Sequence, residues 1–121
     1  MSRPGGLIAW QWATYDRNHR DRLNLVLHFV AVPAFIAGVL SSLRFVTLGL
    51  FVPAAAMLGV AALAFLVQGI GHKREAEAPI PFSGPLDVVG RILVEQFITF
   101  PRFVFTGGWA RNLAGQHTDQ H

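Results

Sequence analysis

Cysteine is absent from these 121 residues, and charged side chains are scarce. Without cysteine the chain can form neither disulfide bonds nor thiolate metal sites, and it has no cysteine nucleophile. Charged residues make up 14% of the sequence and hydrophobic residues 52%. A domain of this size has a high surface-to-volume ratio and cannot bury so much apolar surface in water. The composition therefore predicts a single membrane domain over residues 1–121.

The formal net charge of +3 comes almost entirely from arginine. These cations are not gathered on one soluble surface, which argues against nucleic acid as a partner. Near a membrane the same side chains suit anionic headgroups or an acidic amphiphile. The sequence has no glycine-rich phosphate loop, nucleophile elbow or H-E-x-x-H motif, so it lacks the signatures of the enzymes that use them.

Two uncharged apolar stretches are long enough to cross a bilayer. They cover residues 23–43 and 45–71, and a helical span needs roughly 20 residues. We therefore expect an all-α integral membrane protein whose two spans form an antiparallel hairpin with its turn at Ser41–Arg44. Basic residues are concentrated at the outer ends of both spans, and Arg44 alone marks the turn, so the positive-inside rule puts the outer ends in the cytoplasm.

The remaining segments are shorter or less apolar. Residues 7–15 carry aromatic rings that favour the membrane interface and predict an interfacial helix. Residues 86–106 predict a third helix, amphipathic or partly inserted. On that helix Arg91 and Glu95 share one face, where we expect them to pair with each other or with headgroups. Residues 107–121 are polar and predict a mobile tail.

Three histidines lie at the same end of the predicted hairpin. His19 and His28 lie where the first span begins and His72 lies where the second ends, so an antiparallel hairpin gathers three imidazoles at one membrane face. His19 and His28 would oppose each other on one unbroken helix, so convergence requires a break near residues 20–22. Ionisable groups at a bilayer boundary are costly and indicate function. The cluster predicts a divalent-metal site, and imidazole suits zinc, copper, iron and nickel alike.

Polar side chains near these histidines can fix the orientation of metal ligands from a second layer. The candidates for that layer are Asn24, Gln68 and Glu77. Glu75 is a further candidate for that layer, and either Glu75 or Glu77 could instead be a direct ligand. The sequence also leaves structural interpretations open: packing for His28, interfacial anchoring for His19 and helix capping for His72.

The pattern of these residues resembles a family of small multi-span membrane proteins. It runs Tyr15…His19…Asn24…His28…Pro33, then Gln68…Gly71-His72…Glu75…Pro79, and it ends in Phe100-Pro101-Arg102-Phe103. The resemblance covers roughly residues 10–109. The fungal member of this family is the endoplasmic-reticulum 2-hydroxy fatty acid dioxygenase of phytosphingosine degradation, and bacterial relatives share a similar pattern.

The resemblance implies a dioxygenase that uses Fe(II) and O2 to remove one carbon oxidatively from a 2-hydroxy fatty acid. It points to His19, His28 and His72 as the iron-binding positions. Because the 2-hydroxy acid can supply all four electrons, neither 2-oxoglutarate nor a nicotinamide is required, which agrees with the missing nucleotide-binding motif. Arginine is well shaped to pair with the substrate carboxylate, and the candidates are Arg17, Arg20 and Arg22.

Two other functions fit the residues alone. One is a non-enzymatic membrane-assembly subunit, whose small-residue helix surface binds a partner or a second copy of the chain as a homo-oligomer. The other is a haem-binding membrane protein with His28 and His72 as axial ligands. The expected location is the bacterial inner membrane, with the histidine cluster on the cytoplasmic side.

Overall fold

The computed structural model describes residues 5–116, and every regular element in that range is helical. The elements in chain order are α1 (Gly6–Tyr15), a 3-10 turn (Asp16–Asn18), α2 (Arg22–Thr47), α3 (Phe51–His72), α4 (Pro85–Val94), a π-helical turn (Glu95–Thr99), α5 (Phe100–Phe105) and α6 (Gly108–Leu113). This confirms the all-α class that the composition and spacing predict.

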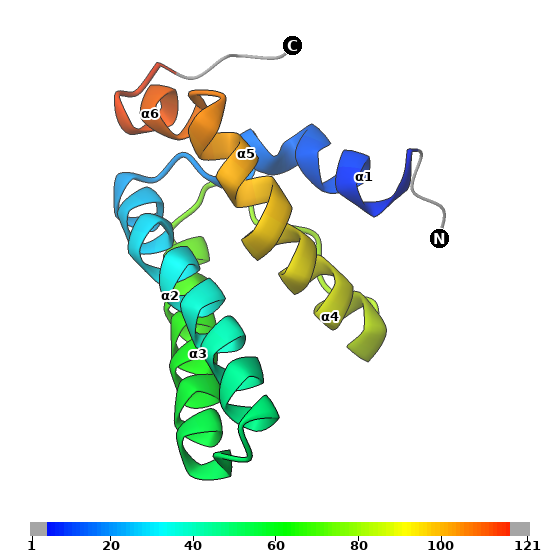
Figure 1. Ribbon diagram of the computed structural model, residues 1–121. Helices are drawn as coiled ribbons and strands as arrows, with labels where there is room; N and C mark the ends of the chain where they lie inside the picture. Colours follow the sequence, from blue (N-terminus) through cyan, green and yellow to red (C-terminus); the bar gives the residue numbers. More distant parts are fainter. Residues whose placement is uncertain (1–4, 117–121) are drawn as a thin grey trace.

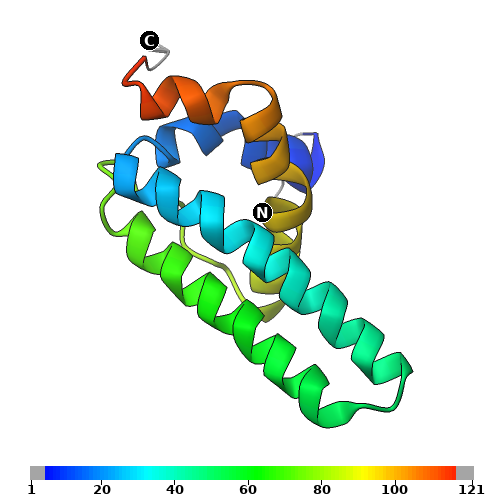
Figure 2. The same cartoon turned by 60° about the vertical axis from the view of Figure 1, so that its left-hand side comes forward.

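Helices α2 and α3 form the predicted antiparallel hairpin, the long cyan-to-green pair in Figures 1 and 2. Both are long and apolar enough to cross a membrane. The turn lies at residues 48–50, so the expected turn at Ser41–Arg44 is wrong. Arg44 lies in the last turns of α2, where a cation faces the free helix carbonyls favourably. The helix ends instead before Gly49, whose φ of 72° suits glycine.

The break that convergence requires lies just before α2. The Asp21 carboxylate caps the helix by accepting the backbone N–H of Asn24 at 3.0 Å. The same carboxylate accepts a hydrogen bond from Arg74 Nε at 2.8 Å. This bond joins the start of α2 to the chain just after α3. His19 therefore lies ahead of the helix in a non-helical segment, free of the helical spacing that would turn it away from His28.

Polar side chains are buried in this bundle beside apolar ones, and many large apolar side chains lie on its outside. The most deeply buried polar residues include Asn24, His28, Gln68 and Gln96. On the outside, Val52 is 83% exposed and Val30 67%. A water-soluble protein buries its large apolar side chains and exposes its polar ones. The inverted arrangement is what contact with lipid favours.

The segment after residue 106 is more ordered than the sequence suggested. Residues 107–121 were expected to form a mobile tail, yet α6 covers part of that range and packs over the start of α2. The indole Nε1 of Trp109 donates to the carbonyl of Leu25 at 2.8 Å, and Asn112 Nδ2 donates to the carbonyls of Asp16 and His19 at 3.0 and 2.8 Å. These hydrogen bonds hold α6 against the start of α2 and the segment before it. Residues 117–121 of the expected tail lie outside the described part of the chain.

The helix expected over residues 86–106 is present as α4, the π-helical turn and α5 in direct succession (Figure 1). In the π-helical turn the backbone N–H of Phe100 donates to the carbonyl of Glu95, five residues back. The next residue, Pro101, has no backbone N–H and cannot continue a regular hydrogen-bond ladder. Wide turns of this kind are frequent at functional sites, and this one carries Glu95 inward.

Gly38 allows α2 and α3 to approach closely. A Cβ there would lie 2.8 Å from the Met57 carbonyl oxygen and 3.0 Å from the Ala61 backbone nitrogen. We expect Gly38→Ala to lower the midpoint of thermal unfolding in detergent, because overpacking costs about 1–3 kcal/mol. The matched control is Gly59→Ala, whose Cβ meets no atom within 4 Å. Equal stability of the two variants would contradict the close approach.

Candidate metal centre

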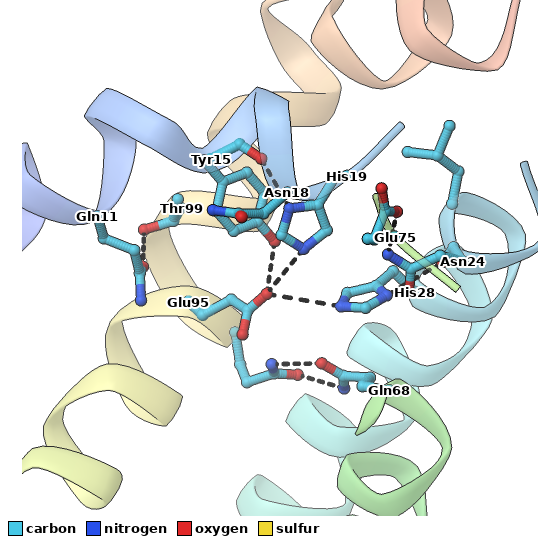
Figure 3. Close-up of polar contacts among 12 residues, drawn as sticks. Gln11, Tyr15, Asn18, His19, Asn24, His28, Gln68, Glu75, Glu95 and Thr99 are labelled. Carbon is cyan, nitrogen blue, oxygen red and sulfur yellow. Dashed lines mark hydrogen bonds and ion pairs between the residues drawn. The ribbon is translucent and has the colours of Figure 1, made fainter. Parts of the chain in front are cut away.

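Four side chains that can bind a metal meet at the histidine end of the hairpin: His19, His28, His72 and Glu95. One nitrogen from each imidazole and one carboxylate oxygen lie within 4.8 Å of one another. The three rings meet edge to face, with centroids 4.7–4.8 Å apart in every pair. Figure 3 shows His19 and His28 directed at the Glu95 carboxylate. The structure thus brings together the three histidines that the sequence placed at this end, and it adds a carboxylate.

Backbone carbonyls set the tautomers of two of these rings. Nδ1 of His19 lies 2.7 Å from the carbonyl of Tyr15, and Nδ1 of His28 lies 3.1 Å from the carbonyl of Asn24. A carbonyl oxygen only accepts hydrogen bonds, so each Nδ1 carries the proton. In the neutral ring the lone pair is then on Nε2. Both Nε2 atoms face Glu95 Oε2, at 3.4 Å from His19 and 3.6 Å from His28.

The inward-facing nitrogens have no hydrogen-bond partner within the described chain. These buried atoms are Nε2 of His19, Nε2 of His28 and Nδ1 of His72. Lone pairs directed at a carboxylate repel it, and a buried polar atom without a partner costs about 1–3 kcal/mol. A cation at the centre converts this repulsion into attraction. Imidazole nitrogen and carboxylate oxygen are ligands of iron, zinc and related divalent metals, so the residues fit such an ion.

Tyr15 positions the carboxylate. Its hydroxyl donates to Glu95 Oε2 at 2.7 Å, and its ring stacks on His19 with centroids 3.8 Å apart. Burial raises the pKa of Tyr15 well above its usual value, and the adjacent Glu95 adds to the effect, so the phenol remains a donor.

The charges of the cluster suit metal binding. Burial alone would raise the pKa of Glu95, but the hydrogen bonds and positive charge that the His19 and His28 rings supply when they are protonated outweigh it and hold that pKa well below its usual range. Burial lowers the pKa of His19, against the opposing effect of Glu95. A carboxylate anion and a neutral imidazole are the forms that bind a metal.

The π-helical turn that carries Glu95 is held from two sides. The amides of Gln68 and Gln96 exchange two hydrogen bonds of 2.8 Å each, which joins α3 to the turn. The hydroxyl of Thr99 donates to Gln11 Oε1 on α1 (Figure 3). Gln68, a candidate for the second layer, therefore acts on the element that presents the carboxylate.

The other second-layer candidates have different positions. Asn24 orients His28 through its carbonyl, and its side-chain amide donates to Glu75 at 2.6 Å. Glu75 lies outside the metal-binding group, because its carboxylate accepts the backbone N–H groups of Arg20 and Asp21 at 2.9 and 3.0 Å. Free N–H groups ahead of a helix attract a carboxylate. Glu77 is exposed and pairs with Arg17 at 3.1 Å, away from the cluster.

Sequence reasoning missed Glu95 as a possible ligand. Arg91 and Glu95 were expected to pair with each other or with headgroups, but Arg91 binds the carbonyls of Ile80 and Pro81 and the carboxylate of Asp87. Glu95 is left to face the histidines. A signal was present, since a lone carboxylate in an apolar helix is costly unless it has a specific partner.

A cavity of about 240 Å³ reaches the cluster. His19, His72 and Glu95 line it together with apolar side chains, among them Trp10, Phe65, Ile80, Phe82 and Ile92, and polar ones that include Gln68 and Arg91. Arginine was expected to receive a substrate carboxylate here, at Arg17, Arg20 or Arg22. None of these three is among the described residues that line the cavity. Arg17 and Arg20 border a separate polar recess, and Arg22 donates to the carbonyl of Leu113 at 3.0 Å.

Glu95→Gln tests the carboxylate directly. The amide keeps the size of the side chain and removes the charge, so we expect metal affinity to fall by at least about tenfold. The measurement is metal content after equilibration at a fixed free-metal concentration. The control is Glu77→Gln on the surface, which should bind as the unmodified protein does. Full metal content in Glu95→Gln would remove Glu95 from the site.

Comparison with known proteins adds a family to this geometry. The family described as 2-hydroxy-palmitic acid dioxygenase Mpo1-like matches residues 7–105, which include all four members of the cluster. Neither the curated proteins nor the solved structures give a match. The matched segment covers most of the chain and contains the histidine pattern on which the resemblance rests. The chain belongs to the 2-hydroxy-palmitic acid dioxygenase Mpo1-like family.

Proposed function

We propose that this protein is a membrane-bound, iron-dependent dioxygenase that shortens 2-hydroxy fatty acids by one carbon. The observation that carries the proposal is the buried set of three imidazole nitrogens and one carboxylate at the end of an apolar cavity. The family description supports the substrate class. The cavity suits an apolar chain whose polar end meets the cluster.

The reaction balances with O2 as the only co-substrate. A 2-hydroxy acid, R–CH(OH)–COOH, and O2 give R–COOH, CO2 and H2O, and the substrate supplies all four electrons. Bound iron would supply a template for the substrate carboxylate and hydroxyl and a redox partner for O2. Zinc has no redox chemistry of its own, so the reaction favours iron among the metals that this ligand set accommodates.

The side chains have distinct roles in this proposal. His19, His28, His72 and Glu95 would hold the ion, with two rings kept in the required tautomer by backbone carbonyls. Tyr15 keeps the Glu95 carboxylate in place. His28 is not among the cavity-lining residues, whereas His19, His72 and Glu95 are. The substrate would therefore approach from the side of those three, and the apolar walls would exclude water from the reacting carbon.

The two other functions account for less of the geometry. The rings of His28 and His72 are in edge contact, with centroids 4.8 Å apart, and His19 touches both. This arrangement leaves no room for a porphyrin between two axial ligands. An assembly subunit whose histidines only pack would gain nothing from three buried nitrogens without partners.

The same proposal includes a location. The hairpin would cross the bilayer, and the basic residues that flank its open end would face the cytoplasm together with the cluster. The residues concerned are Arg17, Arg20, Arg22, Lys73 and Arg74. A fatty acid in the cytoplasmic leaflet would then carry its carboxylate at the same level as the cluster.

Product analysis tests the reaction. Purified protein loaded anaerobically with Fe(II), then given O2 and 2-hydroxypalmitate, should yield the acid one carbon shorter, with one O2 consumed and one CO2 released per product. His28→Ala should remove both stoichiometric iron and product. Palmitate, which has no 2-hydroxyl, and zinc-loaded protein serve as controls and should yield nothing. Iron-loaded protein that consumes no 2-hydroxy acid of any chain length would refute the proposal.

Tyr15→Phe separates the positioning of Glu95 from the ligands themselves. The substitution keeps the ring that stacks on His19 and removes the hydroxyl that holds Glu95. We expect Fe(II) affinity to fall by about tenfold, with activity largely restored at saturating iron. The measurement is Fe(II) titration against a competing chelator, with thermal unfolding as the check on folding. An unchanged affinity would show that the hydrogen bond does not support the site.

A further inference from the structure

We propose that α4 and the connector before it, residues 78–84, dip into the leaflet on the histidine side as a re-entrant unit, and that the cavity opens sideways to the acyl chains of that leaflet. This inference concerns where lipid surrounds the protein and does not depend on the proposed reaction. Five features of the structure support it.

The first is the inverted amphipathic character of α4. Its charged residues, Asp87 and Arg91, point inward, and Arg91 is only 8% exposed. Its outer face carries Leu86, Val89 and Leu93, and Leu86 is 89% exposed. A surface helix of a water-soluble protein would present its charges outward and its apolar side chains to the protein. Apolar side chains directed outward fit a lipid surrounding.

The second is the hydrogen bonding of the connector. Non-helical backbone at membrane depth is tolerated only where its polar groups are satisfied by protein or water. Arg91 donates to the carbonyls of Ile80 and Pro81, at 2.7 and 3.2 Å, and the backbone N–H of Ser83 donates to Asp87 at 3.0 Å. Pro79 and Pro81 have no backbone N–H to satisfy. The two inward-facing charges of α4 thus bind three polar groups of the connector backbone.

The third is the neutralisation of Arg91 itself. A lone arginine inside a bilayer is costly. Here the Asp87 carboxylate lies 3.4 Å from a guanidinium nitrogen, and the rings of Trp10 and Phe82 lie 5.1 and 4.4 Å from the guanidinium carbon. Aromatic faces stabilise a cation best where water is excluded. These contacts lower the free-energy cost of placing the Arg91 charge at membrane depth.

The fourth is the reach of the unit. Ten helical residues extend about 15 Å, roughly half of the 30 Å hydrocarbon core. Figure 1 shows α4 and the hairpin diverging from the histidine end, with the start of α4 well short of the level of the hairpin turn. The helix is short enough to stay within one leaflet, so the partner is the acyl chains of that leaflet.

The fifth is the rim of the cavity. Ile80 and Phe82 on the connector and Gly69 on α3 line the cavity and are also exposed on the outside, Ile80 at 50% and Phe82 at 45%. The rim is apolar and continues the exposed apolar surface of α3. An amphiphile would enter the cavity from the leaflet with its acyl chain parallel to the surrounding lipid chains and its polar head group at the cluster.

Depth measurements with single cysteines test this arrangement, because the natural chain has none. Leu86→Cys and Ile80→Cys, each labelled with an environment-sensitive NBD fluorophore, are reconstituted in phosphatidylcholine vesicles. The vesicles carry a nitroxide either at carbon 12 of the acyl chain or on the headgroup. Leu63→Cys in mid-α3 is the control for lipid, and Lys73→Cys after α3 is the control for the aqueous boundary.

We expect both test positions to resemble Leu63: blue-shifted emission, and stronger quenching by the acyl-chain nitroxide than by the headgroup nitroxide. If the Leu86 label behaves as the Lys73 label does, α4 is not inserted and the proposal is overturned. If Leu86 reports lipid and Ile80 reports water, the cavity opens to water and access from the leaflet is overturned. Neither readout uses iron or substrate, so failure here is distinguishable from failure of the proposed reaction.

Discussion

Repulsion between the imidazole lone pairs of His19 and His28 and the Glu95 carboxylate is the constraint on which the rest of the structure depends. The surrounding protein holds these groups in place rather than relieving the repulsion. Carbonyls fix the protons on the far side of His19 and His28, and Tyr15 and the Gln68–Gln96 amide pair hold Glu95 against the rings. A site arranged in this way before an ion arrives lowers the cost of ordering ligands when it binds. The hairpin, the chain break before α2 and the π-helical turn all serve this convergence.

Much of this arrangement could be predicted from the sequence, because it follows from span length. Two apolar stretches joined by a short turn force both outer ends to one side, and His19, His28 and His72 are fixed to those ends. The turn itself was placed too early, since Arg44 interrupts the hydropathy and the helix continues through it to Gly49. A charged residue ends an apolar stretch in a hydropathy profile, but it does not end a helix. A helix ends where the backbone leaves the helical conformation, here just before Gly49.

Side-chain direction in the third helix could not be predicted. Helical spacing placed Arg91 and Glu95 on one face, and in the structure the two side chains bind different partners. Those partners, the connector carbonyls and the histidines, lie in segments distant along the chain, and sequence spacing within one helix carries no sign of them. Sequence position was also a poor guide for Glu75. It lies near His72 along the chain, but its carboxylate accepts hydrogen bonds from the backbone N–H groups of Arg20 and Asp21 ahead of α2. The three arginine candidates lie outside the cavity lining for a related reason, because closeness in sequence does not place a side chain in a cavity.

The bond from Asn112 to the carbonyl of His19 has a consequence for biogenesis. Helix α6 comes last among the described elements, yet it anchors the segment that presents the earliest of the four cluster residues. This hydrogen bond can form only after residue 112 has been synthesised, so the sequence of both long helices is complete in the growing chain before the segment that carries His19 is anchored.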